Sequence, residues 1–184
     1  IEPLLSVSPA KPWEILAITF TNKAAGELKE RLERMLGEQA RDIWASTFHS
    51  ACVRMLRRNA ENIGYSSNFT IYDTDDSKRV IKDCIKQLGF SDKILTPKTC
   101  LGEISRAKDS LLSPEEYTQQ NYVDIMKLNV GAVYASYQAR LKAADAMDFD
   151  DIIVNAVRLL QSNDEVLGYY QRKFRYIMVD EYQD

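Results

Sequence analysis

Residues 14–37 read EILAITFTNKAAGELKERLERMLG, and this stretch predicts a β-strand that runs directly into an α-helix. The apolar run of residues 14–20 is typical of a buried strand. Thr21 or Asn22 can cap the helix that follows, and Gly37 marks its expected end. The apolar residues of the helix recur at helical spacing: Ala24, Ala25, Leu28, Leu32, Met35 and Leu36.

The same plan occurs once more along the chain, and a third strand is predicted near the end of the sequence. Residues 42–48 (DIWASTF) predict a second short strand, and the helical pattern of residues 49–64 follows it at once. Residues 174–179 (FRYIMV) predict a third strand, whose continuous apolar run is typical of a sheet covered on both faces. Because two of these strands feed helices directly, the sequence favours a parallel sheet with crossover connections.

The middle of the chain has a different character. From residue 68 to about residue 144 the pattern is helical nearly throughout, with breaks at Gly89, Thr96-Pro97 and Ser113-Pro114. Residues 123–144 read as one long helix. We therefore expect an all-helical insertion inside an α/β domain, with residues 1–68 and 144–184 in the α/β part and residues 69–143 in the insertion.

Composition excludes several classes of protein. A net charge of −3 gives no global basic signal, so nucleic-acid binding requires a local patch. Three cysteines without a C-x-x-C pair and a single histidine argue against a zinc site and for a reducing, cytoplasmic location. No apolar stretch approaches the roughly 20 residues of a membrane helix, so we expect no membrane partner.

Aromatic and polar side chains follow the first two predicted strands. An aromatic ring at a strand end offers a stacking face for a base, and a helix amino terminus offers phosphate contacts. The alternative is an ordinary capped helix start with surface side chains, including the arginines of residues 54–58. The candidates are Phe20, Thr21, Asn22 and Lys23 after the first strand, and Phe48 and His49 after the second.

Two acidic segments are further candidates. The third strand leads into residues 179–184 (VDEYQD), where Asp180 and Glu181 are adjacent. One interpretation is a pair in which Asp180 holds a magnesium ion on nucleotide phosphates while Glu181 polarises the attacking water. The alternative is a pair of solvated acids. Residues 148–152 (DFDDI) are most simply an acidic helix start.

The order of these segments resembles the UvrD/PcrA/Rep group of superfamily 1 DNA helicases. ILAITFTNKAAGELKERL, STFHSACVRMLRR, MDFDDI and VDEYQD look like motifs Ia, Ib, Id and II of that family, and the resemblance covers essentially all 184 residues. It implies a partial RecA-like P-loop NTPase domain (1A) with a large helical insertion (1B). It also implies ATP-driven translocation on single-stranded DNA and unwinding of duplex, with Mg²⁺ and ATP as cofactors.

The resemblance also assigns roles to residues and partners to the parent enzyme. Asp180 would bind the magnesium ion, Glu181 would be the catalytic base, and both would contact the nucleotide. Gln183 would sense the nucleotide state. Single-stranded DNA and single-strand/double-strand junctions would be the partners, in DNA repair or replication. The residues expected along the single strand are Phe20, Asn22, Phe48 and His49, with Thr21 and Lys23 at its phosphates.

One element of the family pattern is missing. A phosphate loop of the form G-x-x-x-x-G-K-[ST] should precede the strand of residues 14–20, but no glycine in the sequence is followed by lysine. We therefore expect the chain to be the middle of a helicase motor, active in hydrolysis only in its parent.

Two other classes remain open at this point. The chain could be a non-catalytic module whose helical insertion docks DNA or protein while the α/β part serves as scaffold. It could also be a carboxylate metal enzyme, such as a phosphatase or nuclease, that uses Asp180, Glu181 and Asp184. Salt-dependent strand binding without nucleotide would favour the first class. Magnesium-dependent cleavage of a phosphate ester without nucleotide would favour the second.

Overall fold

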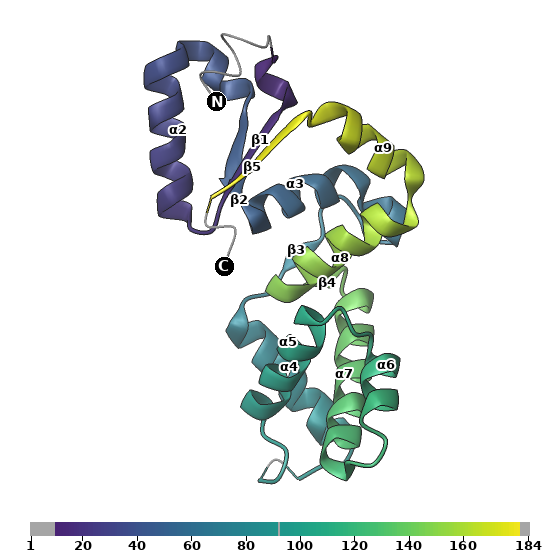
Figure 1. Ribbon diagram of the computed structural model, residues 1–184. Coiled ribbons are helices and arrows are strands. Elements are labelled where there is room, and N and C mark those ends of the chain that lie inside the picture. The colour runs from purple at the N-terminus through teal and green to yellow at the C-terminus, as the bar shows by residue number, and fades with distance from the viewer. Residues whose placement is uncertain (1–9, 92, 181–184) are drawn as a thin grey trace. The chain divides into compact units, whose positions relative to one another are not determined.

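The structure is a computed structural model that describes residues 10–91 and 93–180. The chain forms two compact units (Figure 1). We call the first the sheet unit, which comprises Ile1–Asn59 and Ala156–Asp184, and the second the helical unit, which comprises Ala60–Asn155. Each is described separately below.

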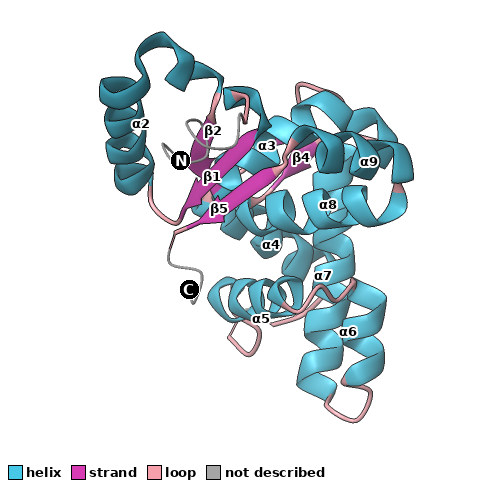
Figure 2. Ribbon diagram, turned by 45° about the horizontal axis from the view of Figure 1, so that its top comes forward, coloured by secondary structure: helices cyan, strands magenta, loops and turns pink. Residues whose placement is uncertain are grey.

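A three-stranded parallel sheet organises the sheet unit. Its strands are β1 (Ile15–Thr19), β2 (Trp44–Thr47) and β5 (Tyr176–Val179), in the order β2-β1-β5 (Figure 2). Both neighbouring pairs are parallel. The three strands are those that the sequence predicts, and the predicted parallel pairing is confirmed.

Helices pack on both faces of this sheet (Figure 1). On one face, Leu32 of α2 (Asn22–Leu36) joins Ile15 and Ala17 of β1 in a buried cluster. α3 (Phe48–Asn59) and α9 (Asp164–Lys173) lie on the other face, where Trp44 packs edge-on against Tyr170 of α9 and against Phe174, the residue that follows α9. Alternation of side chains along each strand therefore gives the sheet two apolar faces.

The caps of α2 follow the sequence. The Thr21 side chain accepts a hydrogen bond from the Ala24 backbone N–H at 3.1 Å, which satisfies one of the free amides at the helix start. Gly37 ends the helix with φ 61°, a conformation that glycine adopts without a Cβ clash. A 3₁₀-helix, η2 (Gly37–Asp42), then leads to β2, and another, η1 (Pro12–Glu14), precedes β1.

The prediction that residues 176–179 form a strand covered on both faces is wrong. Ile177 is 61% exposed, and the other residues of β5 are only partly buried. Among the described strands β5 pairs only with β1, so it lies at an edge of the described sheet. A continuous apolar run cannot by itself distinguish a central strand from an edge strand.

Four capped helices form most of the helical unit. They are α4 (Thr74–Gln87), α5 (Pro97–Asp109), α6 (Pro114–Gln120) and α7 (Ile125–Ala143). Their first turns are capped by the side chains of Asp73, Thr96, Ser113 and Asp124. Gly89, in a left-handed conformation with φ 73°, follows α4. The predicted breaks therefore fall between real helices, although the long helix begins at Ile125 and not at Val123.

The sequence did not predict the two-stranded sheet in the helical unit. β3 (Thr70–Ile71) pairs in parallel with β4 (Ala146–Met147), so the start and the end of the helical segment lie side by side. The 3₁₀-helix η3 (Ala60–Ile63) and Gly64, with φ 69°, precede β3. Strands of two residues are too short to produce a detectable alternation of apolar residues.

The helical unit begins before and ends after the predicted insertion of residues 69–143. The helix α8 (Phe149–Ser162) starts in the helical unit and continues into the sheet unit, because the division falls between Asn155 and Ala156. The assignment of these parts as helicase domains 1A and 1B stays a prediction. No helix in the described part of the chain is long and apolar enough to span a bilayer.

Candidate functional site

The carboxyl ends of the three parallel strands bring the predicted site residues to one edge. Thr19 lies opposite Thr47, and Ile18 lies opposite Val179. The Asp180 backbone N–H donates to the Ile18 carbonyl at 2.9 Å, so the ladder continues one residue beyond β5. Neighbouring strands lie about 4.8 Å apart. Phe20, Phe48 and Asp180 therefore follow adjacent strand ends, and we call this place the carboxyl edge.

Phe20 projects from the carboxyl edge. Its side chain is 62% exposed, and it separates β1 from the first turn of α2. The Thr19 hydroxyl donates to the Thr21 carbonyl at 3.2 Å, which fixes the turn between them. Asn22 and Lys23 are the first exposed residues of α2. The turn thus presents an aromatic face next to a helix amino terminus and a free ammonium group.

The second strand end has a similar construction. Phe48 is the first residue of α3 and is 39% exposed, while His49 is half-buried. The Ser50 backbone N–H donates to the Thr47 hydroxyl at 3.3 Å, and the two hydroxyls share a hydrogen bond at 2.9 Å. Because Thr47 holds the first turn of α3 through its side chain, the position of Phe48 is fixed relative to β2.

Asp180 lines an open pocket of about 400 Å³ between the sheet and α2. The charged residues of the pocket wall are Asp180, Glu27 and Arg31, and its remaining lining is mainly apolar. Glu181, Gln183 and Asp184, which the sequence analysis also singled out, lie outside the described residues. The described part of the acidic motif is therefore one exposed carboxylate at the carboxyl edge.

A magnesium ion is compatible with this arrangement. Magnesium usually keeps several waters and takes one or two protein carboxylates together with substrate phosphates, so a single exposed Asp180 fits that coordination. Among residues 10–91 and 93–180 no group of three His, Cys, Asp or Glu side chains could hold a metal ion by itself. Among these described residues, an ion at Asp180 would need further ligands, such as those that a bound phosphate supplies.

The DFDDI segment forms a buried ionic network inside the helical unit. The Lys108 ammonium of α5 is 1% exposed and lies 2.6 Å from Asp148 Oδ2 and 2.8 Å from Asp151 Oδ1. The Tyr137 hydroxyl donates to Asp148 Oδ2 at 2.8 Å, and Gln138 Nε2 donates to Asp151 Oδ1 at 3.0 Å. We call these five residues the Lys108 network.

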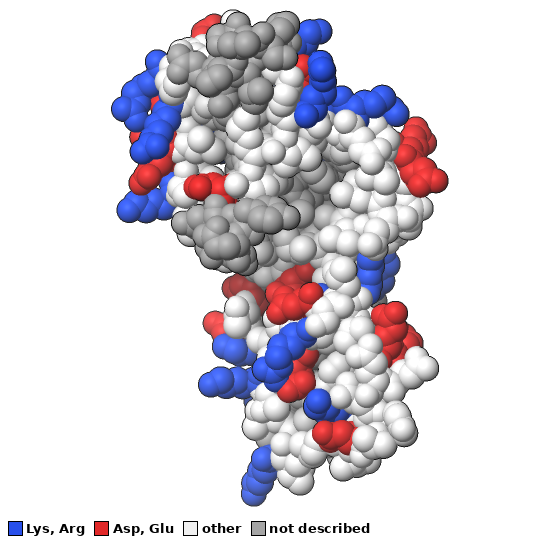
Figure 3. Space-filling view, viewed as in Figure 1, with Lys and Arg blue, Asp and Glu red and all other residues white. Residues whose placement is uncertain are grey.

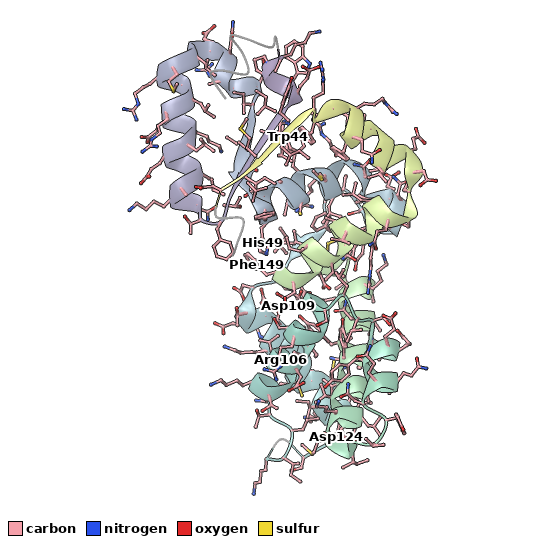
Figure 4. The ribbon with its side chains drawn as sticks, viewed as in Figure 1. Trp44, His49, Arg106, Asp109, Asp124 and Phe149 are labelled. Atoms are coloured by element: carbon pink, nitrogen blue, oxygen red, sulfur yellow. The ribbon has the colours of Figure 1, made fainter. Side chains whose placement is uncertain are left out.

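The same two aspartates also cap α8. Asp148 Oδ1 accepts from the Asp151 backbone N–H at 2.8 Å, and Asp151 Oδ2 accepts from the Asp148 backbone N–H at 3.2 Å. This reciprocal pair is a capping box with aspartate in both positions. The predicted helix start is therefore confirmed, but Asp148 and Asp151 are buried, whereas Phe149 between them is 55% exposed (Figure 4).

Burial dominates the electrostatics of the Lys108 network. It raises the pKa of Asp151, against the opposing effect of the nearby Lys108 ammonium. Burial also raises the pKa of the Tyr137 hydroxyl, and the charge of Asp148 raises it further. Tyr137 therefore stays a hydrogen-bond donor at neutral pH.

Cys52 and Cys100 are unsuited to nucleophilic chemistry, because burial raises the pKa of each thiol to about 11.

The sequence contained a signal for the Lys108 network. Cys100, Ile104 and Ala107 are buried on one face of α5, and Lys108 continues that face because it is four residues after Ile104. A lysine on the apolar face of a helix requires a buried anion. The paired acids of residues 148–151 were the available candidates, but sequence alone does not bring positions 40 residues apart together.

The fold and its carboxyl edge define an α/β protein of the kind that binds ligands where parallel strands end. The motifs and their order along the chain point to one family within this class. The chain belongs to the family described as "UvrD/REP helicase N-terminal domain", whose model matches residues 1–184. The resemblance seen in the sequence is thereby confirmed.

Curated relatives give the same result. The chain is 50% identical over 183 residues to the ATP-dependent DNA helicase PcrA of Bacillus subtilis (strain 168). It is 48% identical over 181 residues to the protein of that name from Staphylococcus aureus (strain Mu50) and 49% identical over 181 residues to that of Staphylococcus epidermidis. Each alignment covers 98% of this chain but only 24–25% of the relative. The chain thus spans about a quarter of the length of these relatives.

Proposed function

We propose that this chain is part of the motor of an ATP-dependent DNA helicase, which moves along single-stranded DNA and unwinds duplex DNA. The observation that carries the proposal is the carboxyl edge, where exposed Phe20 and Phe48 follow two neighbouring strands and Asp180 follows the third. In this proposal, Phe20 and Phe48 stack on DNA and Asp180 binds magnesium. Because all three follow adjacent strand ends, a change at the nucleotide would alter the DNA contacts, and the reverse.

The DNA-binding part of the proposal rests on the turns after β1 and β2. Phe20 and Phe48 would stack on bases, and His49 and Asn22 would line the path of the strand. Thr21 and Lys23 would contact its phosphates at the amino terminus of α2, where backbone N–H groups and the helix dipole favour anions. The exposed position of Phe20 and the cap at Thr21 support this arrangement.

The nucleotide part rests on Asp180 and on two residues outside the described range. Asp180 would hold the magnesium ion, Glu181 would act as catalytic base, and Gln183 would report the nucleotide state. When bound, the ion supplies positive charge that neutralises the phosphates of ATP. Supporting observations are the position of Asp180 at the end of β5 and the pocket beside it.

The finer assignments belong to the same proposal. The sheet unit corresponds to part of a RecA-like motor domain 1A, and the helical unit corresponds to an insertion domain 1B. Single-strand/double-strand junctions are the proposed DNA partners, in DNA repair or replication, and the cytoplasm is the proposed location. Family membership and the names of the relatives, which are ATP-dependent DNA helicases, support these assignments.

Replacing Phe20 by alanine tests the DNA-binding part. Stacking of a base on an aromatic side chain contributes about 1–3 kcal/mol, so Phe20→Ala should weaken binding of a fluorescent single-stranded oligonucleotide about fivefold or more. Lys23→Ala should reduce the slope of log affinity against log salt by about 0.7, as for one lost phosphate contact. Fluorescence anisotropy of the 184-residue chain at several salt concentrations measures both.

Tyr122→Ala is the matched control, because Tyr122 is 74% exposed but belongs to the helical unit. It should leave the affinity within twofold of the unchanged chain. Equal affinities for Phe20→Ala and the unchanged chain would refute the stacking role of Phe20. In that case Phe20 would be a surface residue at a strand end, without a ligand.

A further inference from the structure

Three cations surround one aromatic ring in the sheet unit. The Arg54 guanidinium lies 3.9 Å from the centroid of the Trp44 ring, the Lys173 ammonium lies 5.0 Å from it, and the Arg58 guanidinium lies 5.8 Å from it. Arg54 and Arg58 are exposed on α3, and half-buried Lys173 ends α9. We call Arg54, Arg58 and Lys173 the cation cluster.

The cation cluster is distinct from the carboxyl edge. Trp44 is the first residue of β2, and Lys173 ends α9 just before the chain enters β5 at Tyr176. The cluster therefore lies at the amino ends of the strands, about 10 Å along β2 from Thr47, which precedes the carboxyl edge. Figure 3 shows Lys and Arg side chains over the end of α9 and the start of β5, and Figure 4 marks Trp44.

A rigid aromatic floor supports the cluster. Trp44, Tyr170 and Phe174 are at most 6% exposed, and the rings of Tyr170 and Phe174 are stacked with centroids 5.9 Å apart. Asn59 Nδ2 donates to the Tyr170 hydroxyl at 3.2 Å and fixes the outer end of this floor. Cations held over aromatic faces keep the N–H groups at their edges available to a ligand.

The local charge is opposite to that of the whole chain. The net charge is −3, yet none of the three cations forms an ion pair with a carboxylate in the part of the chain that the structure describes. Burial and the neighbouring Arg58 both lower the pKa of Arg54, so the positive charges repel one another. Such a local concentration of positive charge attracts anions to this surface.

Helix dipoles explain only part of the cluster. Arg58 lies in the last turn of α3 and Lys173 in the last turn of α9, where cations interact favourably with helix carboxyl ends. Arg54 lies one turn earlier and approaches Trp44 most closely. The dipoles therefore account for one cation on each helix, but not for three cations around a single ring.

We propose that the cation cluster binds the phosphate backbone of a nucleic-acid strand, as a second contact separate from the carboxyl edge. Planar guanidinium groups match phosphate oxygens through paired N–H donors. Tyr169, which is 45% exposed and whose ring centroid lies 5.9 Å from Lys173, offers a neighbouring face for a base, which a carboxylate-rich peptide would not use. The proposal shares the DNA partner of the proposed function but requires neither Phe20 nor Asp180.

The test neutralises the cluster and measures binding of a fluorescent 20-nucleotide single strand to the 184-residue chain. The triple variant Arg54→Gln, Arg58→Gln, Lys173→Gln should bind about tenfold more weakly at 0.1 M salt, and its salt slope should fall by about 2, as expected when three phosphate contacts are lost. Combined with Phe20→Ala, the fold-changes should multiply, because distant sites act independently.

A matched control is available on α2 and η2 of the same unit. The triple variant Arg34→Gln, Arg41→Gln, Lys29→Gln also removes two arginines and one lysine, but from exposed positions outside the cation cluster. It should weaken binding less than threefold. Circular dichroism and thermal unfolding check the fold of both variants. If the cluster triple misfolds, the double variant Arg58→Gln, Lys173→Gln leaves Arg54 on Trp44 and should still reduce the salt slope by more than 1.

Three outcomes would overturn the proposal. The first is equal affinity of the cluster triple and the control triple, even when Phe20→Ala weakens binding and so upholds the proposed function. The second is no binding of the oligonucleotide by the unchanged chain. The third concerns the Phe20→Ala chain. If polyglutamate at the same concentration of charge displaced the oligonucleotide from this variant, the cluster would be a site for acidic peptides. Weakened binding by the cluster triple, with the control triple close to the unchanged chain, would uphold the proposal.

Discussion

Lys108 shows how one residue can depend on the rest of its unit. Its ammonium group is almost fully buried and is held by two carboxylates from a segment 40 or more residues away. Removal of a charge from water costs several kcal/mol, which only close partners can offset. The Lys108 network therefore joins α5, α7 and the start of α8 through charge and hydrogen bonds as well as apolar contact.

Replacing Lys108 by methionine should destabilise the protein strongly. Lys108 is the only cation among the five residues of the Lys108 network. Its loss leaves Asp148 and Asp151 buried without a counter-charge, which typically costs about 3–5 kcal/mol of folding free energy. Urea unfolding, followed by circular dichroism, measures the free energy of unfolding. Lys98→Met, an exposed change on the same helix, is the control and should cost less than about 0.5 kcal/mol.

A compensating variant sharpens this test. Lys108→Met combined with Asp148→Asn and Asp151→Asn removes all three charges and should recover most of the lost stability, because a neutral network avoids the buried charge. If the triple variant were no more stable than Lys108→Met, packing around the lysine stem, and not charge, would explain the loss.

Single residues were also where sequence reasoning reached its limit. Thr21 as a cap, Gly37 as a stop and Phe20 as an exposed ring after a strand follow from local pattern, and the structure agrees. The pairing of Lys108 with Asp148 and the approach of Lys173 to Trp44 depend on contacts across many residues, so no local pattern encodes them. Roles of the site residues in binding or catalysis stay predictions.

At the scale of elements, the contact between α6 and α7 is unusually close. Gly131 of α7 faces Thr118 of α6, and a Cβ added at Gly131 would lie 2.3 Å from the Thr118 hydroxyl oxygen. That hydroxyl donates to the Pro114 carbonyl at 2.7 Å. The absence of a side chain at Gly131 therefore allows the two helices to approach, and it keeps this hydrogen bond intact.

Gly131→Ala should therefore destabilise the helical unit. The new methyl group must displace the Thr118 hydroxyl and break its hydrogen bond, with a cost of about 1–2 kcal/mol. Gly102→Ala on α5 is the matched control. It introduces the same methyl group with nothing within 4 Å, and it should stabilise the helix by about 0.5–1 kcal/mol.

Thermal unfolding of the two variants provides the measurement, and the two melting temperatures should move in opposite directions. A rescue variant, Gly131→Ala with Thr118→Ala, should recover part of the loss because it removes the hydroxyl. Similar shifts for both glycine variants would show that helix propensity, and not contact with α6, decides the effect.

Elements were predicted well where periodicity or capping chemistry was strong. Thr96 and Ser113, at two of the expected breaks, start helices because their side chains satisfy free amides, a purely local requirement. The exposure of Ile177 and the β3–β4 pair were missed for different reasons. Exposure of a strand depends on its neighbours in the sheet, and two-residue strands carry too little pattern.

At the scale of the whole molecule, binding and hydrolysis of nucleotide have separate requirements. Asp180 places one exposed carboxylate at the carboxyl edge. In the given sequence no glycine is followed by lysine, so the backbone cradle and lysine of a phosphate loop are not encoded within these 184 residues. In-line attack on a triphosphate requires that its phosphates be held in position as well as neutralised.

We therefore expect the 184-residue chain by itself to release no phosphate from ATP above background, with or without single-stranded DNA. The assay is phosphate release by the purified chain in the presence of magnesium. The Glu181→Gln version is the control, and it should give the same background rate. A DNA-stimulated rate that disappears in the Glu181→Gln chain would contradict this expectation, because it would show that another part of the chain binds the triphosphate.

The β3–β4 pair has a mechanical consequence for the helical unit. The chain enters this unit ahead of β3 and leaves it after β4, and the two strands run in the same direction. Tension applied between entry and exit would pull one strand at its start and the other at its end. The bonds from Thr70 N–H to the Asp145 carbonyl and from Tyr72 N–H to the Met147 carbonyl would then be loaded together, in shear. Bonds loaded in shear share the force, so this small clasp would resist a pull together with the Lys108 network, which holds the start of α8 to α5 and α7.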